Sequence, residues 1–544
     1  MAVLGPTTGT FDGMALAPDL QAACDLWPDR AAITFKGATI TFAELGNRLG
    51  ALAAGYRRMG IGPGDRVVCQ LPNCPEHVMA MNAAWANGAI HVGTDNDLAG
   101  PELAWLVQRT EAAALLFQPR LDRADPLAPV AAVRAACPGT RIILHSPDPS
   151  MGTGPEGAVV LADLLAPTPL AARPAPPAVA DDDTALLLLT SGTTGRPKAI
   201  RESLPHCRAK MQFFADAFGP GLDDVHLVFL PIGHVFGLRL ALLSLLSGGR
   251  LVLLDRFSPE AALGLVGREG VTVLPGMPTH LRLLLDRLDP SRHDTASLRW
   301  AVSAAANLPR PLGEAIYERL GVEMLFVYGC SEGFTTLTTD RDEILAGSVG
   351  ATVFVGPPGT APAGTVAILD PSSTDPLPAG ATGEIAFGAR GPVRYWRAPD
   401  AATDGWYRTG DLGHMDGDGR VYVSGRLTEL LNRGGLKVSP SEIETAIASH
   451  PGVADAAVVA AADPVLGEAI CACIVPTAAG PQPVAPTLGA LRSFLGTSLA
   501  RHKLPDELCV LEHIPRTKIG KVDRAALAAI VERAGQSMER VRPR

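Results

Sequence analysis

The chain has 544 residues, more than one compact core usually holds, so at least two domains are expected. Hydrophobic residues make up 47% and charged residues 19%, a composition typical of globular proteins that argues against global disorder. The 47 Lys and Arg residues against 56 Asp and Glu residues give a net charge of -9, which leaves no broad basic surface. Nucleic acid and anionic membranes are therefore not expected partners.

The N-terminal segment MAVLGPTTGTFDG has neither a basic nor an apolar region, so no secretory signal is expected. The most apolar run, at 238–246, is shorter than the about 20 residues that cross a bilayer. The nine cysteines include no CxxC pair, and Cys471 and Cys473 are expected to be small core residues on one face of a strand. Because reduced thiols are typical of the cytoplasm, we expect a soluble cytoplasmic protein.

Short apolar runs alternate with longer helical patterns along most of the chain. Strands are predicted at 65–71, 227–232, 249–255 and 271–276, and helices at 76–88 and 259–270. This alternation predicts an α/β fold with mainly parallel sheet. Two stretches rich in proline and alanine, 166–183 and 475–488, are expected to be surface loops.

The character of the sequence changes near 426–430. The run RVYVSGR indicates a strand, whereas GGLKVSPSEIETAIASHPGV after it indicates a glycine loop and a helix. Ser439 is expected to cap that helix, with Pro440 at its first position and Glu442 three residues after the serine. We therefore predict two domains, residues 1–428 and 429–544.

A run of four leucines leads directly into a loop rich in glycine and hydroxyl groups, LLLLTSGTTGRPKAI at 186–200. Glycine lets a backbone approach an anion closely, hydroxyls and free N–H groups donate hydrogen bonds, and a lysine adds positive charge. The GxxxxGK[ST] pattern of a Walker A motif is absent, and a solvated polar turn is the alternative. The residue order favours a polyphosphate site made by Thr190, Ser191, Gly192, Thr193, Thr194, Gly195 and Lys198.

The loop TSGTTGRPK resembles the phosphate loop of the adenylate-forming superfamily, which includes acyl- and aryl-CoA synthetases, adenylation domains of peptide synthetases and firefly luciferase. Further motifs of that superfamily follow in the same order over nearly the whole chain. They are PIGHVFGL (231–238), YGCSEG (328–333), GEIAFG (383–388), GWYRTGDLG (405–413), GR (425–426), NRGGLKVSPSEIE (432–444) and PRTKIGKVDR (515–524). The resemblance implies an α/β fold with a large N-terminal domain of mixed, mainly parallel sheets and helices, and a small mobile C-terminal α+β domain.

The resemblance also implies an ATP site with Mg²⁺. Tyr328 would stack on adenine, and Glu332 would bind the Mg²⁺, since a hard cation prefers carboxylate oxygen. Ser331 stands where the superfamily usually has threonine, and its hydroxyl would still reach phosphate. Asp411 would bind the ribose hydroxyls, and Arg426 would lie near the ribose and the α-phosphate.

Lys521 resembles the lysine that stabilises the charge built up when a carboxylate attacks the α-phosphate. His234 resembles the histidine that closes over the carboxylate site, although a lone histidine on an apolar segment is more often structural. Gly434 and Gly435 resemble the loop that enters the site after the small domain rotates, and Glu429 occupies the hinge position, where aspartate or lysine is common. The predicted catalytic residues are Lys521, His234 and Arg426.

The segment 233–237 lacks the aspartate with which amino-acid-activating members pair the substrate ammonium. Val235 replaces the asparagine that members acting on catecholic or 2-hydroxybenzoic acids usually carry. We therefore expect an aromatic or medium aliphatic carboxylic acid without an amino group. Its pocket would be lined by His234, Val235, Phe236, Ala304, Ala305, Ala306, Gly329, Cys330 and Phe334.

Three functions remain open on the sequence. The first is an acid–thiol ligase that forms an acyl-AMP and then a thioester, with coenzyme A as the expected acceptor. The second loads the phosphopantetheine of a separate carrier protein, because the chain has no fused carrier motif. The third is a nucleotide-binding protein that has lost catalysis, against which stand Lys198, Glu332, Asp411, Arg426 and Lys521.

Overall fold

A computed structural model gives the structure of the chain. It describes residues 16–146, 155–165, 183–190, 198–355, 366–373, 375–388, 395–397, 406–463, 465–477, 485–517, 521–534 and 539–540, and only the backbone at 190, 334, 352–355 and 540. Among the helices of these residues, none combines the length and the hydropathy that crossing a membrane needs.

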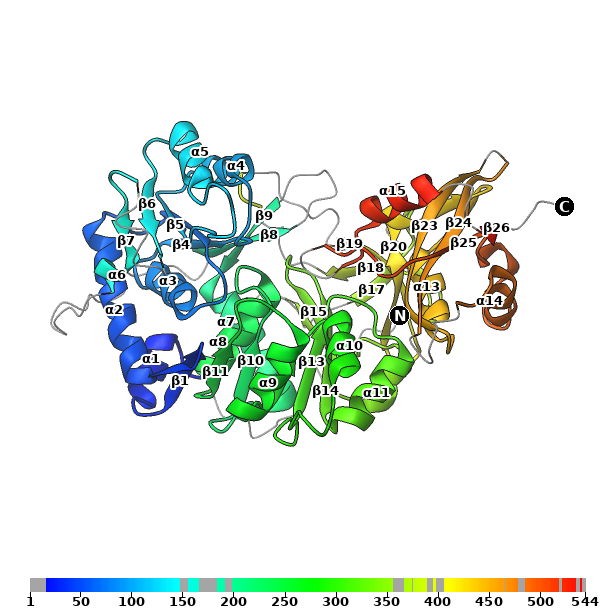
Figure 1. The fold of residues 1–544 in the computed structure, drawn as a ribbon, viewed down its shortest axis with the longest axis horizontal. Coiled ribbons are helices and arrows are strands. Elements are labelled where there is room, and N and C mark those ends of the chain that lie inside the picture. The colour runs from blue at the N-terminus through cyan, green and yellow to red at the C-terminus, as the bar shows by residue number, and fades with distance from the viewer. Residues whose placement is uncertain are drawn as a thin grey trace.

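Two large sheets form the body of the N-terminal part (Figure 1). The seven-stranded sheet contains, in spatial order, β7 (Val159–Val160), β6 (Arg141–Leu144), β5 (Ala114–Phe117), β3 (Arg66–Gln70), β4 (Ile90–Gly93), β8 (Thr184–Thr190) and β9 (Lys198–Ser203). All its neighbouring strands are parallel except β8 and β9.

The nine-stranded sheet contains, in spatial order, β16 (Thr352–Val355), β15 (Phe334–Thr338), β14 (Glu323–Gly329), β13 (Trp300–Ala304), β12 (Val273–Pro275), β10 (Val225–Val228), β11 (Arg250–Leu253), β1 (Ala31–Phe35) and β2 (Ala38–Thr41). Its central strands are parallel, and antiparallel strands lie at both edges. The predicted α/β class with mainly parallel sheets is therefore confirmed.

Helices cover both faces of these sheets because the central strands are apolar on both sides. In β3, Val67 and Cys69 face a core shared with α2 (Phe42–Arg58) and α3 (Pro75–Ala86), whereas Val68 faces α4 (Gly100–Thr110) and α5 (Ala128–Ala136). The remaining helices of this part are α1 (Leu20–Leu26), α6 (Leu161–Leu164), α7 (Leu204–Phe218), α8 (Val235–Leu246), α9 (Pro259–Glu269), α10 (Pro278–Arg287), α11 (Arg310–Leu320) and α12 (Arg341–Leu345).

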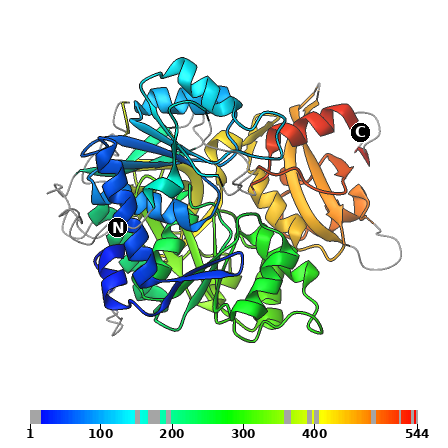
Figure 2. The same ribbon diagram turned by 60° about the vertical axis from the view of Figure 1, so that its left-hand side comes forward.

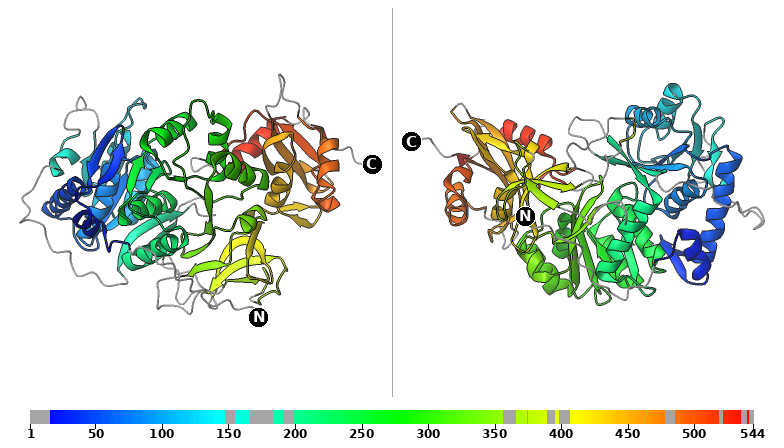
Figure 3. Two further views of the ribbon diagram at one scale, coloured as in Figure 1. Left: turned by 90° about the horizontal axis from the view of Figure 1, so that it is seen from below. Right: turned by 180° about the vertical axis from the view of Figure 1, so that it is seen from behind.

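A four-stranded antiparallel sheet stands apart from the two large ones (Figure 3). It contains β17 (Val366–Leu369), β18 (Gly383–Gly388), β19 (Trp406–Met415) and β20 (Val421–Arg426). The short helix η3 (Leu427–Glu429) follows β20 and leads into the last part of the chain. The predicted division at 428/429 falls within this connection and stays a prediction.

The C-terminal elements form a separate lobe, which Figure 2 shows at the right. Its mixed sheet contains β21 (Leu431–Arg433), β22 (Leu436–Val438), β23 (Val453–Asp463), β24 (Gly467–Pro476), β25 (Glu507–Val510) and β26 (Glu539–Arg540). Its helices are α13 (Pro440–Ala448), α14 (Leu488–Leu495), η4 (Arg501–Lys503) and α15 (Arg524–Ala534). Cys471 and Cys473 are fully buried in the core beneath α15, as predicted.

Most predicted elements match observed ones within a few residues. The expected helix at 76–88 is α3, and the expected strands at 65–71 and 249–255 are β3 and β11. Ser439 is the N-cap residue of α13 and Pro440 its first residue, as predicted, but the expected cap hydrogen bond from the serine side chain is absent. The Ser439 Oγ instead donates to the carbonyl of Ser424 at 2.6 Å, so it ties the C-terminal lobe to β20.

Asn73 joins the two large sheets. Its buried amide nitrogen donates to the carbonyls of Leu230 (3.0 Å) and Leu254 (3.2 Å), and its oxygen accepts from the N–H of Ile232 (2.9 Å). These bonds run from the end of β3 in one sheet to segments that follow β10 and β11 in the other. They pair backbone groups that would otherwise be buried without partners.

Replacing Asn73 with alanine should destabilise the N-terminal part, because each buried group left unpaired costs about 1–3 kcal/mol. Thermal and urea unfolding of Asn73→Ala should show a lower midpoint than the parent. Asn47→Ala, at an exposed position on α2, is the matched control and should change stability by less than about 0.5 kcal/mol. Equal effects of the two substitutions would contradict the assignment.

Candidate active site

The two large sheets meet where their backbones touch without side chains between them. A Cβ on Gly93, at the end of β4, would lie 2.9 Å from the Gly233 Cα, and a Cβ on Gly233 would lie 2.4 Å from the Thr94 oxygen. Only glycine allows this approach. It brings His234 to Asp95, whose Oδ1 lies 2.7 Å from the histidine Nε2. Asp95 was missed from the sequence, although its place just after a parallel strand is a known signal for ligand sites.

Asp411 lies at the centre of a second group. Its carboxylate accepts a hydrogen bond from the Tyr328 hydroxyl (2.7 Å) and another from the Arg426 Nε (2.6 Å). Asp411 and Arg426 are directly opposed on β19 and β20, and Tyr328 reaches them from β14. Burial, and then the Asp411 carboxylate, hold the pKa of Tyr328 well above its ordinary value, so the hydroxyl remains a donor.

The charges of this group act on the pKa of Lys521. Although its side chain reaches solvent, burial and then the Arg426 guanidinium lower the pKa of Lys521, while Asp411 and Glu429 act in the opposite direction. Arg524 binds Glu429 at 3.0 Å, so the predicted hinge residue is held by the helix that follows the lysine. Lys521 is thus close enough to Arg426, Asp411 and Glu429 for their charges to act on its pKa.

Among the described residues, few polar contacts join the two parts of the chain beyond this group. Besides the bond from Ser439 to Ser424, the Asn307 Nδ2 donates to the Ser441 Oγ at 2.9 Å. A Cβ on Gly425 would lie 2.2 Å from the Ser439 Oγ, so β20 and α13 also approach closely here.

Lys198 and Glu332 meet through a tyrosine that the sequence analysis did not single out. The Lys198 Nζ lies 5.3 Å from the centre of the Tyr395 ring, and the Tyr395 hydroxyl lies 3.5 Å from the Glu332 Oε1. The hydroxyls of Tyr395 and Tyr407 are 3.4 Å apart. Burial raises the pKa of both tyrosines, and the Glu332 carboxylate adds to the shift. Tyr395 follows no local motif, so no sequence signal could have found it.

Of the predicted phosphate loop, the structure describes only the two ends, Thr190 and Lys198. Ser191, Gly192, Thr193, Thr194 and Gly195 lie outside the described residues. The flanking residues are described: Thr190 ends β8 and pairs across the ladder with Lys198, the first residue of β9. The predicted loop therefore joins two antiparallel strands at the edge of the seven-stranded sheet.

The predicted acid pocket is assembled in part. Val235 and Tyr407 both pack against a small buried cluster of Leu188, Ile200 and Tyr395, beside the Lys198–Glu332 group. Phe236 is half-buried against the main core. Ala304 is buried at the end of β13, whereas Ala305 and Ala306 are exposed. 

Ala305 has φ +70°, a left-handed conformation that costs an alanine about 1 kcal/mol. Such strain is often found at functional sites. Gly329 is exposed, Cys330 and Ser331 are half-buried, and the side chain of Phe334 lies outside the described part.

A buried charged cluster lies behind the 330–333 turn, and the sequence analysis missed it. Arg239 donates to the Glu202 carboxylate, and Lys210 is close enough for each charge to shift the other's pKa. All three side chains are nearly inaccessible, so two cations face one carboxylate. A Cβ on Gly333 would lie 3.7 Å from His206, whose pKa burial lowers to about 3. Excess positive charge therefore adjoins the turn that carries Cys330 and Glu332.

Gly434 and Gly435 are not brought to this site. They form an exposed two-residue turn between β21 and β22, with φ of +57° and +88°. Positive φ at both positions is the hairpin geometry that favours glycine. Among the described residues, a Cβ on Gly434 would come within 4 Å of Leu466 only, and a Cβ on Gly435 would meet nothing within 4 Å.

Comparison with known proteins agrees with this geometry. The AMP-binding enzyme family matches residues 20–394, and the AMP-binding enzyme C-terminal domain matches residues 442–521. The chain is 34% identical over 541 residues to triostin synthetase I of Streptomyces triostinicus, covering 96% of this chain and 95% of that protein. It is 32% identical over 549 residues to a salicylyl-CoA synthase / salicylate adenylyltransferase of a Streptomyces species, covering 98% and 96%.

Among solved structures, the amide bond synthetase McbA from Marinactinospora thermotolerans matches with a TM-score of 0.80 at 27% identity, covering 95% of this chain and 99% of that one. The superfamily inferred from the ordered motifs is thus confirmed. The chain belongs to the AMP-binding, adenylate-forming enzymes, which use ATP to activate a small carboxylic acid.

Proposed function

We propose that this enzyme joins a non-amino carboxylic acid to AMP and then passes the acyl group to the thiol of coenzyme A. The observation that carries the proposal is the Asp411 carboxylate, which Tyr328 and Arg426 hold by hydrogen bonds. Its charge also acts on the pKa of Lys521. The motifs that carry Tyr328, Asp411, Arg426 and Lys521 would together build one site with an aromatic face, a hydrogen-bond acceptor and two cations. Such a site suits a nucleotide whose α-phosphate is the reacting group.

In the first step, an oxygen of the substrate carboxylate attacks the α-phosphorus of ATP, and the bond to pyrophosphate breaks. Tyr328 would present its ring to adenine, and the remaining acceptor capacity of Asp411 would bind the ribose hydroxyls. Arg426 and Lys521 would stabilise the charge on the α-phosphate as the new bond forms. The negative charge of a bound nucleotide would favour the charged form of Lys521 and oppose the lowering of its pKa by burial and Arg426.

Glu332 is suited to hold Mg²⁺, which would neutralise phosphate charge. Its carboxylate is half-buried, and its contact with Tyr395, at 3.5 Å, is long for a hydrogen bond. Lys198, on the other side of the Tyr395 ring, would reach the outer phosphates. Tyr395 thus contacts both Lys198 and Glu332 and would position the two side chains relative to each other.

In the second step, a thiolate attacks the acyl carbon, a thioester forms and AMP leaves with the bonding electrons. Gly434 and Gly435 would line the path of the thiol after the small domain has rotated. Their exposed turn would move with that domain, because few polar bonds join the domain to the larger part in the described portion of the chain. A carrier-protein phosphopantetheine is the alternative acceptor.

The acid should be aromatic or medium aliphatic. Val235 would give an apolar wall, since it packs against the cluster that contains Tyr395. The segment 233–237 has no carboxylate, and Asp95, which reaches it from β4, is engaged by His234. An ammonium group would also lie near Lys210 and Arg239, which disfavours an α-amino acid.

The first test is acid-dependent exchange of pyrophosphate into ATP, with Mg²⁺, across aryl, aliphatic and amino acids. Exchange with aryl or aliphatic acids, followed by thioester formation when coenzyme A is added, is the expected outcome. Preference for an α-amino acid would overturn the substrate class. Thioester formation only on a carrier protein would select the alternative acceptor, and no exchange despite ATP binding would indicate lost catalysis.

Lys521→Ala should lower the exchange rate by about 10²–10³-fold, the usual effect of removing one group that stabilises transition-state charge. Thioester formation from added acyl-AMP should be retained, since that step does not form a bond at phosphorus. Lys503→Ala is the control, because Lys503 lies in the same lobe and binds Glu442 at 2.6 Å. An exchange rate equal to the parent's would refute the role of Lys521.

Asp95→Asn should raise the KM for the acid about tenfold with little change in the KM for ATP. Hydrogen bonds to charged groups contribute about 1.5–3 kcal/mol, and 1.4 kcal/mol corresponds to about tenfold. Asp97→Asn, two residues further along and 3.8 Å from Arg120, is the matched control. If the two variants have the same KM for the acid, Asp95 does not position His234 for substrate.

A further inference from the structure

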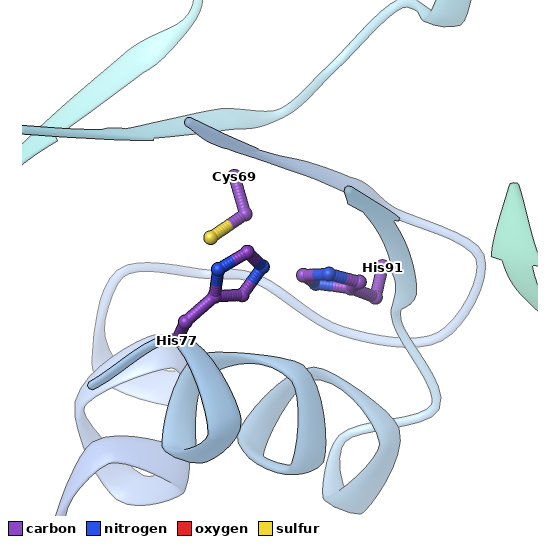
Figure 4. A group of neighbouring side chains, drawn as sticks. All are labelled: Cys69, His77 and His91. Carbon is purple, nitrogen blue, oxygen red and sulfur yellow. The ribbon is translucent and has the colours of Figure 1, made fainter. Parts of the chain in front are cut away.

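Three potential metal ligands converge in the core of the seven-stranded sheet, away from the residues assigned to the nucleotide. Figure 4 shows Cys69 on β3, His77 on α3 and His91 on β4 pointing toward one another. One donor atom from each lies within 4.8 Å of the others, and all three side chains are fully buried. A tetrahedral ion with bonds of about 2.0–2.3 Å holds such atoms about 3.4–3.6 Å apart, so only a small inward adjustment is needed.

The two histidines have lone pairs without partners among the described residues. The His77 Nδ1 lies 3.3 Å from the Pro72 carbonyl, which fixes the proton on that nitrogen and leaves Nε2 as a buried acceptor. Neither ring nitrogen of His91 has a partner within the described part. Leaving buried polar groups unpaired is costly, and a carbonyl on the far nitrogen is the usual support of a metal-bound histidine.

The protonation state of the two histidines also favours metal binding. Burial lowers the pKa of His77 to about 4 and holds that of His91 well below its ordinary value, so both rings are neutral near pH 7. Neutral imidazole is the form that binds metals. Burial raises the pKa of the Cys69 thiol, so an entering ion must displace its proton, which leaves for solvent.

We propose that Cys69, His77 and His91 form a binding site for a transition-metal ion that prefers sulfur and nitrogen donors, Cu⁺ or Zn²⁺. One thiolate and two neutral imidazoles leave a neutral site with Cu⁺ and a single positive charge with Zn²⁺. A buried unpaired charge is unfavourable, and structural Zn²⁺ normally takes four protein ligands. Charge and ligand number therefore favour Cu⁺.

A second group supplies a route from the surface. Cys74, Glu76 and His145 also bring ligand atoms within 4.8 Å of one another, and the Cys74 thiol is close enough to Cys69 to be affected by its charge. Glu76 and His145 are each 18% exposed, whereas Cys74 is buried. An ion could pass inward along these donors, which provides the entry path that a buried site requires.

The site would stabilise the segment that supplies Asp95. His91 lies two residues before Gly93, whose backbone abuts Gly233, and four residues before Asp95, which binds His234. An ion linking β3, α3 and β4 would therefore hold the end of β4 in place. The proposal is independent of the enzyme's substrate, and its test measures binding rather than activity.

The test uses the full chain, freed of metal by unfolding with a chelator and refolded with Cu⁺ under reducing conditions or with Zn²⁺. Metal retained after gel filtration should be about one ion per chain, with release of about one proton on binding. Cys69→Ala and His91→Phe should each retain at least tenfold less. His226→Phe is the matched control, because His226 is buried, also has two unpartnered ring nitrogens, and belongs to no three-ligand group in the described residues.

Loss of metal in the two variants but not in His226→Phe supports the site, and the more tightly retained ion identifies the occupant. No retained metal in the parent, or equal retention in all variants, overturns it. If the variants fail to fold, X-ray absorption of the loaded parent decides. One sulfur at about 2.3 Å with two imidazole nitrogens is expected, and a shell without sulfur overturns the site.

Discussion

The backbone contact between Gly93 and Gly233 is the constraint on which the proposed acid-binding side of the enzyme depends. Two sheets can meet this closely only where neither strand end carries a side chain. Asn73 satisfies the polar groups that the same junction buries. With the junction fixed, His234 and Asp95 come from different sheets yet lie 2.7 Å apart. The geometry of the site is therefore set by main-chain packing, which is more rigid than contacts between long side chains.

The nucleotide side is organised around one buried carboxylate. Asp411 alone would be costly to bury, but Tyr328 and Arg426 satisfy both of its oxygens. The three residues come from β14, β19 and β20, so the small antiparallel sheet must sit against the nine-stranded one for the group to form. Removing any of the three would leave the others with unbalanced charge or an unpaired donor.

The C-terminal lobe is joined to the larger part differently. Its own core is apolar, whereas its contacts with the larger part include isolated hydrogen bonds such as Ser439 to Ser424 and Asn307 to Ser441. Each hydrogen bond of this kind contributes little net free energy, so the lobe can exchange these bonds for others at a small cost in free energy. The ion pair between Arg524 and Glu429 joins α15, the helix after Lys521, to η3, the short helix between the two parts of the chain. The position of the lysine therefore depends on the conformation of η3.

The sequence by itself determined the fold class and the family, because these depend on local periodicity and on ordered motifs such as YRTGDLG. The nucleotide residues that it predicts stay a proposal. It also located Cys471 and Cys473 in the core from strand alternation alone. Only the tertiary structure decided that Asp95 reaches His234, that Tyr395 lies between Lys198 and Glu332, and that Ser439 binds Ser424 instead of capping its helix. The same holds for Cys69, His77 and His91, which come from three different elements. Local patterns record which face of an element is buried, whereas contacts between distant elements follow from how those faces pack in three dimensions.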